Sequence, residues 1–273
     1  MEKRPSTKGR LQWQRAVVIV SAGEGKRFRG TALKQFLKLG EQSIVRHTFQ
    51  AFVSTNLFQQ IVLVLPPSYV QSIRRDFQNE IPSFLRFETV GGGSTRQESV
   101  WRGLQAIQPP CNLVLVHDGV RPFPSQRLIE SVVEASQEVI AAIPIVPLRD
   151  TVKELDSQGR ILKTLSRENL WAAQTPQGFH FSVLKNAHAW AQEQKYEGTD
   201  DAALLERMGI PVRTVPGETT NIKITVPEDL KLAKYILQDL KTERVPFPSP
   251  IASSEESIRG VIGKKGKRRI LEG

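Results

Sequence analysis

Short apolar runs alternate with helically spaced segments from Ala16 to Leu240, and this alternation restricts the architectures open to the chain. Four of the runs are rich in β-branched residues and bounded by turn or polar residues. They are residues 16–20, 60–65, 113–116 and 139–146. Their nearly continuous hydrophobicity is typical of strands buried on both faces. The pattern therefore predicts an α/β fold, a mostly parallel sheet with helices on both faces.

Five further segments carry apolar residues at helical spacing. They lie within residues 44–52, 100–107, 128–133, 183–191 and 230–240. Thr225 and Pro227 are start signals for the last of these helices. We find no internal repeat and no second domain, so we expect one domain over residues 16–240.

Residues 151–165 interrupt the alternation. Two strand-like runs, 151–155 and 160–165, are joined by Asp156-Ser157-Gln158-Gly159, which is typical of a hairpin turn. A hairpin inserted into a parallel-sheet domain serves as a surface flap or as a dimerisation arm, and the residues alone favour neither.

The net charge of +10 comes mainly from the two ends of the chain. Residues 1–15 and 241–273 each carry a net +4, which leaves +2 for residues 16–240. Both ends are expected to be flexible basic tails. Residues 264–269 are five cations and a glycine, a run suited to nucleic acid or anionic lipid. A solvated tail without a specific partner is the favoured interpretation.

The composition also excludes several classes of protein. A single cysteine, Cys111, excludes an intrachain disulfide and a cysteine-based zinc cluster. No apolar run approaches the roughly 18 residues that span a membrane, and no stretch resembles a secretory signal. We therefore expect a cytoplasmic protein.

A glycine-containing loop, residues 21–30, follows the first predicted strand. Glycines in this position let backbone N–H groups approach a phosphate. Phe28 replaces the third glycine of the dinucleotide fingerprint, and no Gly-Lys-Ser/Thr of a Walker A loop follows. Lys26, Arg27 and Lys34 supply the cations that a triphosphate needs, although a simple tight turn is the alternative.

The third predicted strand leads into His117-Asp118-Gly119-Val120-Arg121-Pro122. Ligands of open α/β sheets bind beyond the carboxyl ends of the strands. Asp118 is thus placed to hold Mg²⁺ and Arg121 to bind a phosphate. The alternative makes Asp118 a turn former and Arg121 a surface residue. His117 is interpreted as structural.

Two further segments are candidates for ligand contacts. Gly91, Gly92 and Gly93 precede a predicted helix and let the chain pass close to a flat ligand, whose edge Ser99 would read; a flexible linker is the alternative. Lys223 ends an apolar run before the last helix, where it either snorkels or binds a phosphate.

Taken in order, seven segments resemble the 2-C-methyl-D-erythritol 4-phosphate cytidylyltransferases of the non-mevalonate isoprenoid pathway. The segments are 21–37, 92–103, 116–122, 149–151, 170–178, 198–206 and 221–230. The resemblance covers nearly all of residues 16–240 and neither tail. It implies a Rossmann-like nucleotidyltransferase fold and a homodimer joined by the hairpin 151–165 as an arm, within an arm and partner-site segment of 147–178. It also implies transfer of the cytidylyl group of CTP to methylerythritol phosphate.

The resemblance also implies roles for individual residues. The cytidine pocket would be lined by Ser21, Ala22, Gly23, Gly25, Gly93, Ser99 and Gly119. The triphosphate would be held by Arg27, Lys34 and Lys223. Asp118 would lie beside Mg²⁺ and the acceptor. Methylerythritol phosphate would be bound by Arg121 and Thr199 and, from the partner's arm, by Arg167 and Thr175.

The chain departs from the family pattern at three places. Thr220 and Ser94 stand where acidic residues are common, and Gly119-Val120 replaces a common Ala-Ala pair. Two alternative functions remain open: a cytidylyltransferase for another polyol phosphate such as ribitol 5-phosphate, and a nucleic-acid-binding protein that uses the basic tails.

Overall fold

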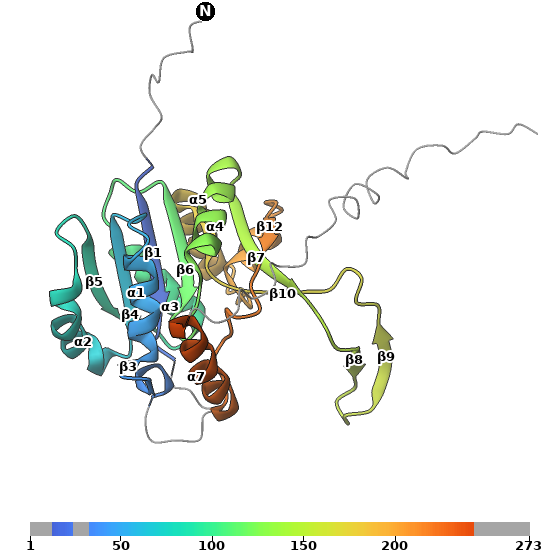
Figure 1. Ribbon diagram of the computed structural model, residues 1–273. Helices are drawn as coiled ribbons and strands as arrows, with labels where there is room; N and C mark the ends of the chain where they lie inside the picture. The colour runs from blue at the N-terminus through green and yellow to red at the C-terminus, as the bar shows by residue number, and fades with distance from the viewer. Residues whose placement is uncertain (1–12, 24–32, 243–273) are drawn as a thin grey trace, which may run out of the picture.

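The computed structural model describes residues 13–23 and 33–242. Within them a main sheet of eight strands has the order β10-β7-β11-β6-β1-β4-β5, with β12 paired to β7 (Figure 1). The strands are β1 (Arg15–Val20), β4 (Gln60–Leu65), β5 (Arg86–Gly91), β6 (Leu113–Asp118), β7 (Ala141–Pro147), β10 (Trp171–Ala173), β11 (Gln177–His180) and β12 (Arg213–Pro216). Strands β6, β1, β4 and β5 run parallel, whereas β10 and β11 are antiparallel to their neighbours. The predicted mostly parallel sheet is confirmed.

Helices cover both faces of this sheet, as predicted (Figure 1). They are α1 (Ile44–Val53), α2 (Val70–Phe77), α3 (Arg96–Ala106), α4 (Gln126–Glu138), α5 (Phe181–Glu193), α6 (Asp201–Arg207) and α7 (Pro227–Thr242). A short strand pair, β2 (Lys38–Leu39) and β3 (Gln42–Ser43), precedes α1. All five helices expected from spacing are present.

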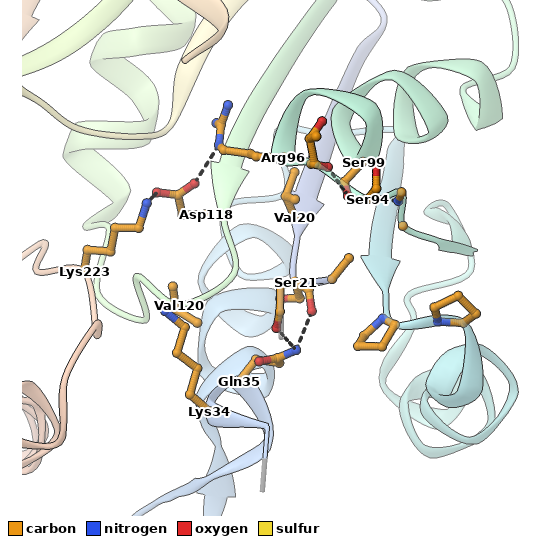
Figure 2. Close-up of a pocket in the computed structure, with 17 residues that line it drawn as sticks. Val20, Ser21, Lys34, Gln35, Ser94, Arg96, Ser99, Asp118, Val120 and Lys223 are labelled. Atoms are coloured by element: carbon orange, nitrogen blue, oxygen red, sulfur yellow. Dashed lines mark hydrogen bonds and ion pairs between the residues drawn. The ribbon is translucent and has the colours of Figure 1, made fainter. Parts of the chain in front are cut away.

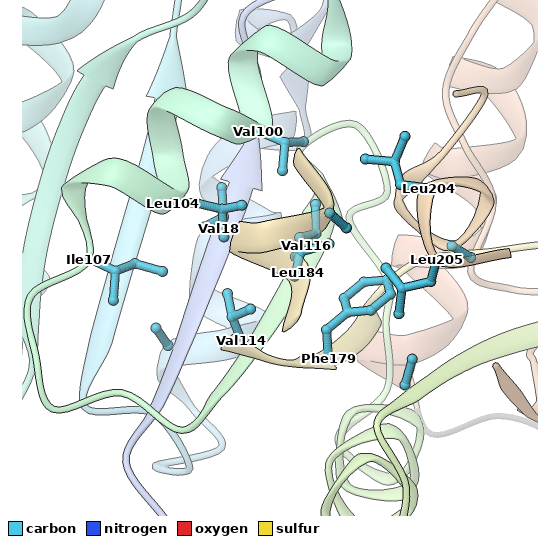
Figure 3. Close-up of a cluster of buried hydrophobic side chains, with 14 of the residues drawn as sticks. Val18, Val100, Leu104, Ile107, Val114, Val116, Phe179, Leu184, Leu204 and Leu205 are labelled. Carbon is cyan, nitrogen blue, oxygen red and sulfur yellow. The ribbon is translucent and has the colours of Figure 1, made fainter. Parts of the chain in front are cut away.

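Alternate side chains of each central strand pack into two separate cores, one on each face of the sheet. In β1, Ala16 and Val18 face the cluster formed with α3, α5 and α6, which Figure 3 shows. Val17 and Ile19 face the opposite cluster, formed with α1, α2 and α4. All four are fully buried, so the nearly continuous hydrophobicity of the strand reflects burial on both faces.

The hairpin consists of β8 (Val152–Leu155) and β9 (Ile161–Leu165), which pair only with each other in the described structure and project from the body (Figure 1). After the hairpin, the predicted arm and partner-site segment of 147–178 includes β10 and β11, which return to the main sheet.

The predicted N-terminal tail is too long. β1 begins at Arg15, and the ring of Trp13 meets that of His180 edge-on at a centroid distance of 5.3 Å. The remaining tail residues, 1–12 and 243–273, lie outside the described residues.

Candidate active site

A cavity of about 750 Å³ opens at the carboxyl ends of β1, β4, β5 and β6 (Figure 2). Parallel strands bring their carboxyl ends, and the loops that follow them, to one edge of the sheet. The cavity is lined by residues 20–23, 34–35, 66–67, 92–96, 99, 118, 120 and 223. Predicted residues Ser21, Ala22, Gly23, Lys34, Gly93, Ser99, Asp118 and Lys223 are therefore brought together.

One wall of the cavity is the loop that follows β1. Buried Gln35 fixes its shape, because Nε2 donates to the carbonyl oxygens of Ser21 at 2.7 Å and Gly23 at 3.1 Å. Gly119 packs against this loop: a Cβ added there would lie 1.7 Å from Ser21 Oγ. A side chain at position 119 would require the Ser21 hydroxyl to turn away from its present position. Predicted residues Gly25 and Arg27 fall in 24–32, outside the described residues.

The facing wall is the glycine segment before α3. Thr95 caps this helix, because its hydroxyl accepts from the N–H of Glu98 at 3.1 Å. Ser99 Oγ accepts from the N–H of Gly93 at 3.1 Å and thereby holds the glycine segment against the helix. A Cβ at Gly92 would lie 2.1 Å from the Cβ of Ala22, so glycine at position 92 allows the two walls to approach.

Ser94 departs from the family pattern, but a carboxylate still lies beside it. Its N–H and hydroxyl donate to Glu98 Oε2 at 2.7 and 2.8 Å. These bonds, together with Arg102, lower the pKa of the Glu98 carboxyl. The acidic group at this wall therefore comes from the first turn of α3.

Asp118 lies at the centre of a cluster of cations at the end of β6. Its Oδ2 is 2.8 Å from Lys223 Nζ and 3.5 Å from Arg121 Nε, and its Oδ1 is 3.3 Å from Arg96 Nε (Figure 2). Burial would raise the pKa of Asp118, but Arg96, Lys223 and Arg121 outweigh it and hold that pKa far below its ordinary value. The carboxylate is ionised, and the cluster has an excess of positive charge.

Lys223 is positioned through the backbone on both sides of it. The N–H of Ile224 donates to the carbonyl of Val120 at 2.9 Å, and Arg121 Nη1 donates to the carbonyl of Asn221 at 2.8 Å. Lys34 Nζ also donates to the carbonyl of Ile224, at 3.1 Å. The segment that carries Lys223 is therefore tied to the loop after β6 and to the other lysine of the cavity.

Thr175 is not on the hairpin, so the expectation that it reaches a partner's site is wrong. It is buried, and its Oγ1 accepts from the N–H of Asp118 in the same chain at 3.0 Å. The same oxygen is 3.1 Å from Nδ1 of His117, whose Nε2 is 3.0 Å from the carbonyl of Arg121. Burial lowers the pKa of His117 to about 4, so the ring is neutral, which supports the structural interpretation.

Besides Thr175, three predicted substrate residues lie outside the set that lines the cavity. Arg121 is turned to Asp118 and the carbonyl of Asn221. Thr199 is exposed in the loop before α6. Arg167 is exposed after the hairpin, where its guanidinium donates to the carbonyl of Arg149.

The charge pattern does not support Asp118 as a direct ligand of a resident Mg²⁺. Both of its oxygens already face cations, and no other carboxylate of the described residues lines the cavity. Among residues 13–23 and 33–242, no group of three or more His, Cys, Asp or Glu side chains could hold a metal ion. A magnesium ion in this cavity would need phosphate oxygens as its main ligands.

Three residues that sequence reasoning missed are central to the cavity. Gln35 shapes the first loop, and Arg96 joins Asp118 to the buried carboxylate of Asp201. Gln174 Oε1 accepts from the N–H of Glu218 at 3.1 Å and from Asn221 Nδ2 at 3.4 Å, which supports the segment before Lys223. Arg96 is the first residue of α3, where the helix dipole disfavours a cation. An arginine at this position of a predicted helix could therefore have indicated a nearby anion.

Open α/β sheets bind ligands at the carboxyl ends of their strands, and the two lysines that line this cavity suit an anionic ligand such as a phosphate. Residues 15–239 match the family model for 2-C-methyl-D-erythritol 4-phosphate cytidylyltransferase. The chain belongs to this family.

Individual relatives agree with this assignment. A 2-C-methyl-D-erythritol 4-phosphate cytidylyltransferase from Syntrophus aciditrophicus is 40% identical over 221 residues, which cover 81% of this chain and 94% of that protein. The crystal structure of the Thermus thermophilus enzyme of the same name has a TM-score of 0.67 at 36% identity and covers 81% of this chain and 98% of its own. The 4-diphosphocytidyl-2C-methyl-D-erythritol synthase structure from Anaerococcus prevotii gives 0.73 at 29% identity, over 83% of this chain and 99% of that one.

Proposed function

We propose that the cavity binds CTP and 2-C-methyl-D-erythritol 4-phosphate and joins them into 4-diphosphocytidyl-2-C-methyl-D-erythritol, with release of pyrophosphate. The observation that carries this proposal is the meeting of Lys34 and Lys223, which are far apart in sequence, in one cavity beside Asp118. Two anions that repel each other must meet during the reaction, and fixed cations lower that repulsion.

The cytidine would lie between the two glycine-containing walls. Ser21, Ala22 and Gly23 form one wall and Gly93 and Ser99 the other, with Gly119 packed behind Ser21. Gly92 keeps the walls close enough to hold a flat ring. Gly25, outside the described residues, stays a predicted CTP-binding residue.

Lys34 and Lys223 would hold the triphosphate and stabilise the charge that develops on the α-phosphoryl oxygens. Both side chains are anchored, Lys34 to the carbonyl of Ile224 and Lys223 to Asp118, so little reorganisation is needed as the reaction proceeds. Arg27 would add a third cation from the loop after β1.

The reaction needs no general base. The nucleophile is an oxygen of the acceptor phosphate, which is already anionic near neutral pH. This oxygen forms a bond to the α-phosphorus of CTP while the bond from that phosphorus to the bridging oxygen breaks and pyrophosphate leaves. Catalysis therefore depends on in-line positioning and charge stabilisation.

Mg²⁺ would enter the cavity as part of the Mg–CTP substrate. It typically keeps several waters and binds substrate phosphates with one or two carboxylates at most. Asp118 would then act on the protein's own cations: its contacts with Lys223 and Arg121 would keep Lys223 in place beside the triphosphate. Thr175 fixes the backbone of Asp118 from within the same chain.

The binding site for the acceptor would be completed by a residue from a second copy of the chain. Arg167 follows the projecting hairpin and lies outside the set that lines this chain's own cavity, so it would act at a partner's cavity. Leu155, Ile161 and Leu162 of the hairpin are 53–62% exposed, and Trp171 beside it is 48% exposed. Large apolar side chains gathered on a projecting element are typical of an interface. We therefore expect a homodimer. Thr199, before α6, would reach the acceptor from the chain's own side.

The dimer is tested by removing this apolar surface. The wild-type protein is expected to elute at the mass of two chains, and the Ile161→Asp/Leu162→Asp variant at the mass of one, with reduced turnover because Arg167 no longer reaches a second cavity. Light scattering coupled to size-exclusion chromatography measures the mass. Lys163→Gln, which removes an exposed ion pair with Glu154 on the same hairpin, is the matched control and should stay dimeric. A wild-type monomer, or an unchanged double variant, would contradict the arm.

Two other functions have less support. A ribitol 5-phosphate cytidylyltransferase would use the same CTP walls and differ only around the acceptor. A nucleic-acid role would rest on residues 1–12 and 243–273, outside the described structure, and contact through the C-terminal tail stays a prediction, as does a cytoplasmic location. No helix within residues 13–23 and 33–242 is long and apolar enough to cross a membrane. Pyrophosphate release from CTP with a panel of acceptors separates these functions.

A further inference from the structure

Behind Asp118, a chain of polar side chains continues away from the cavity into the core. Arg96 Nε donates to Asp118 Oδ1 at 3.3 Å, and its Nη1 donates to Asp201 Oδ2 at 2.8 Å. The other oxygen of Asp201 lies 2.9 Å from Nε2 of His188. The side chains of Asp201 and His188 are 1% exposed, so neither contacts a ligand in the cavity.

This network of polar side chains connects three helices on one face of the sheet. Arg96 begins α3, His188 is on α5 and Asp201 begins α6. The imidazole of His188 also stacks on the indole of Trp101, with ring centroids 6.4 Å apart and an angle of 17° between the planes. The imidazole that contacts Asp201 is thus itself packed against the indole of Trp101.

Stability does not account for these charges. The surrounding parts of α5 and α6 are packed through fully buried apolar side chains such as Leu184, Ala187 and Leu205. Removing an ion pair from water costs several kcal/mol per ion, and well-packed apolar residues are often as stable or more so. Asp201 and His188 contact the cavity through Arg96, which lines it, so their burial is better explained by an effect on the orientation of Arg96.

What the pair orients follows from the planar guanidinium of Arg96. Two of its nitrogens are engaged by different carboxylates, and the third, Nη2, is buried without a hydrogen-bond partner in the described structure. Without Asp201, the guanidinium would be free to turn and engage both oxygens of Asp118. It would then compete directly with Lys223 for Oδ2.

We propose that Asp201 and His188 are positioning residues for cytidylyl transfer: they hold Arg96 so that Asp118 keeps one oxygen for Lys223. The inference rests on the proposed function of the same cavity. It predicts an effect on the transfer step without an equal effect on CTP binding, because the walls that would hold the cytidine do not include these residues.

The first variant is Asp201→Asn, which keeps the shape and removes the charge. We expect kcat with CTP and methylerythritol phosphate to fall about 10²-fold, the size typical of a misplaced catalytic group, with a much smaller rise in the KM for CTP, because the cytidine walls are unchanged. Glu80→Gln is the matched control: it removes the partner of Arg46 in another partly buried ion pair, neither member of which lines the cavity, and should leave kcat unchanged.

Removal of a buried charge can prevent folding, so two variants at His188 test the same proposal without removing the Asp201 carboxylate. His188→Gln keeps a side-chain N–H for Asp201, whereas His188→Leu keeps only apolar volume. We expect the leucine variant to lose about tenfold in kcat and the glutamine variant to recover most of it. Recovery by the residue that restores the hydrogen bond separates positioning from packing.

Variants that melt at lower temperature but turn over like the wild type would show that the network of Arg96, Asp201 and His188 is only structural. That result would overturn the inference. Equal losses for His188→Gln and His188→Leu would overturn it as well. Wild-type activity is measured in the same assay: an active wild type with unaffected variants rejects this inference alone, whereas an inactive wild type rejects the proposed function and this inference with it.

Discussion

Replacing Lys34 by alanine is expected to lower kcat for CTP and methylerythritol phosphate by about 10²–10³-fold while the protein stays folded. The ammonium of Lys34 lines the cavity and is held against the carbonyl of Ile224, on the segment that carries Lys223. A fixed cation of this kind stabilises charge that develops in the transition state, so its removal affects turnover more than folding. Initial rates of pyrophosphate release, with circular dichroism for the fold, measure both effects.

The matched control is Lys38→Ala, which removes an exposed lysine a short way further along the chain, outside the residues that line the cavity. It should turn over like the wild type. Turnover of Lys34→Ala within a few-fold of the wild type would remove the phosphate role assigned to this lysine and with it the main support for the mechanism.

Asp118→Asn is expected to reduce both activity and stability. Arg96, Arg121 and Lys223 would lose the anion that they share, and breaking a buried ion pair from one side costs about 3–5 kcal/mol. Misplacement of Lys223 should lower kcat by a further factor of about 10² in the fraction that remains folded. Urea denaturation gives the free energy of unfolding, and the same pyrophosphate assay gives kcat.

Glu88→Gln provides the comparison for Asp118→Asn, because it removes a carboxylate from an exposed ion pair with Arg74. Exposed pairs contribute about 0–1 kcal/mol, so this variant should differ little from the wild type. An Asp118→Asn protein as stable as Glu88→Gln would contradict the charge cluster, and one with normal kcat would contradict the role of Asp118 in holding Lys223.

The parts of the fold that could be predicted are those with a strong apolar period. Strands β1, β4, β6 and β7 and helices α1, α3, α4, α5 and α7 were expected because their apolar side chains face a core. Helix α7 packs into a third cluster with Leu39 and Ile224, and the others pack into the two cores beside the sheet. Strand β5 is a weaker signal, since it lies at the edge of the sheet and alternates Phe87 and Val90 with polar residues. Helix α2 buries only Ile73 and Phe77.

Strands β10 and β11 could not be predicted from local pattern. They are three and four residues long and gain their partners through pairing with β7 and β6, which are distant in sequence. For the same reason Thr175 was assigned to a partner, although it supports Asp118 in its own chain.

In the candidate site, residues on strand ends and in glycine-containing loops could be predicted, because the ends of parallel strands meet at one edge. Residues that act from behind this edge could not. Asp200 caps α6, an ordinary role for an acidic residue at a helix start. Asp201 instead pairs with Arg96, 105 residues away in sequence, and with His188, 13 residues away. Only the packing of α3, α5 and α6 brings these three together.

The most direct test of the central claim is the initial rate of pyrophosphate release by the full-length wild-type protein. CTP is supplied with 2-C-methyl-D-erythritol 4-phosphate, with ribitol 5-phosphate, or with other sugar-alcohol phosphates. We predict rapid release with methylerythritol phosphate and a kcat/KM lower by about 10²-fold or more for the other acceptors. Equal or faster release with ribitol 5-phosphate, or no release with any acceptor, would contradict the assignment.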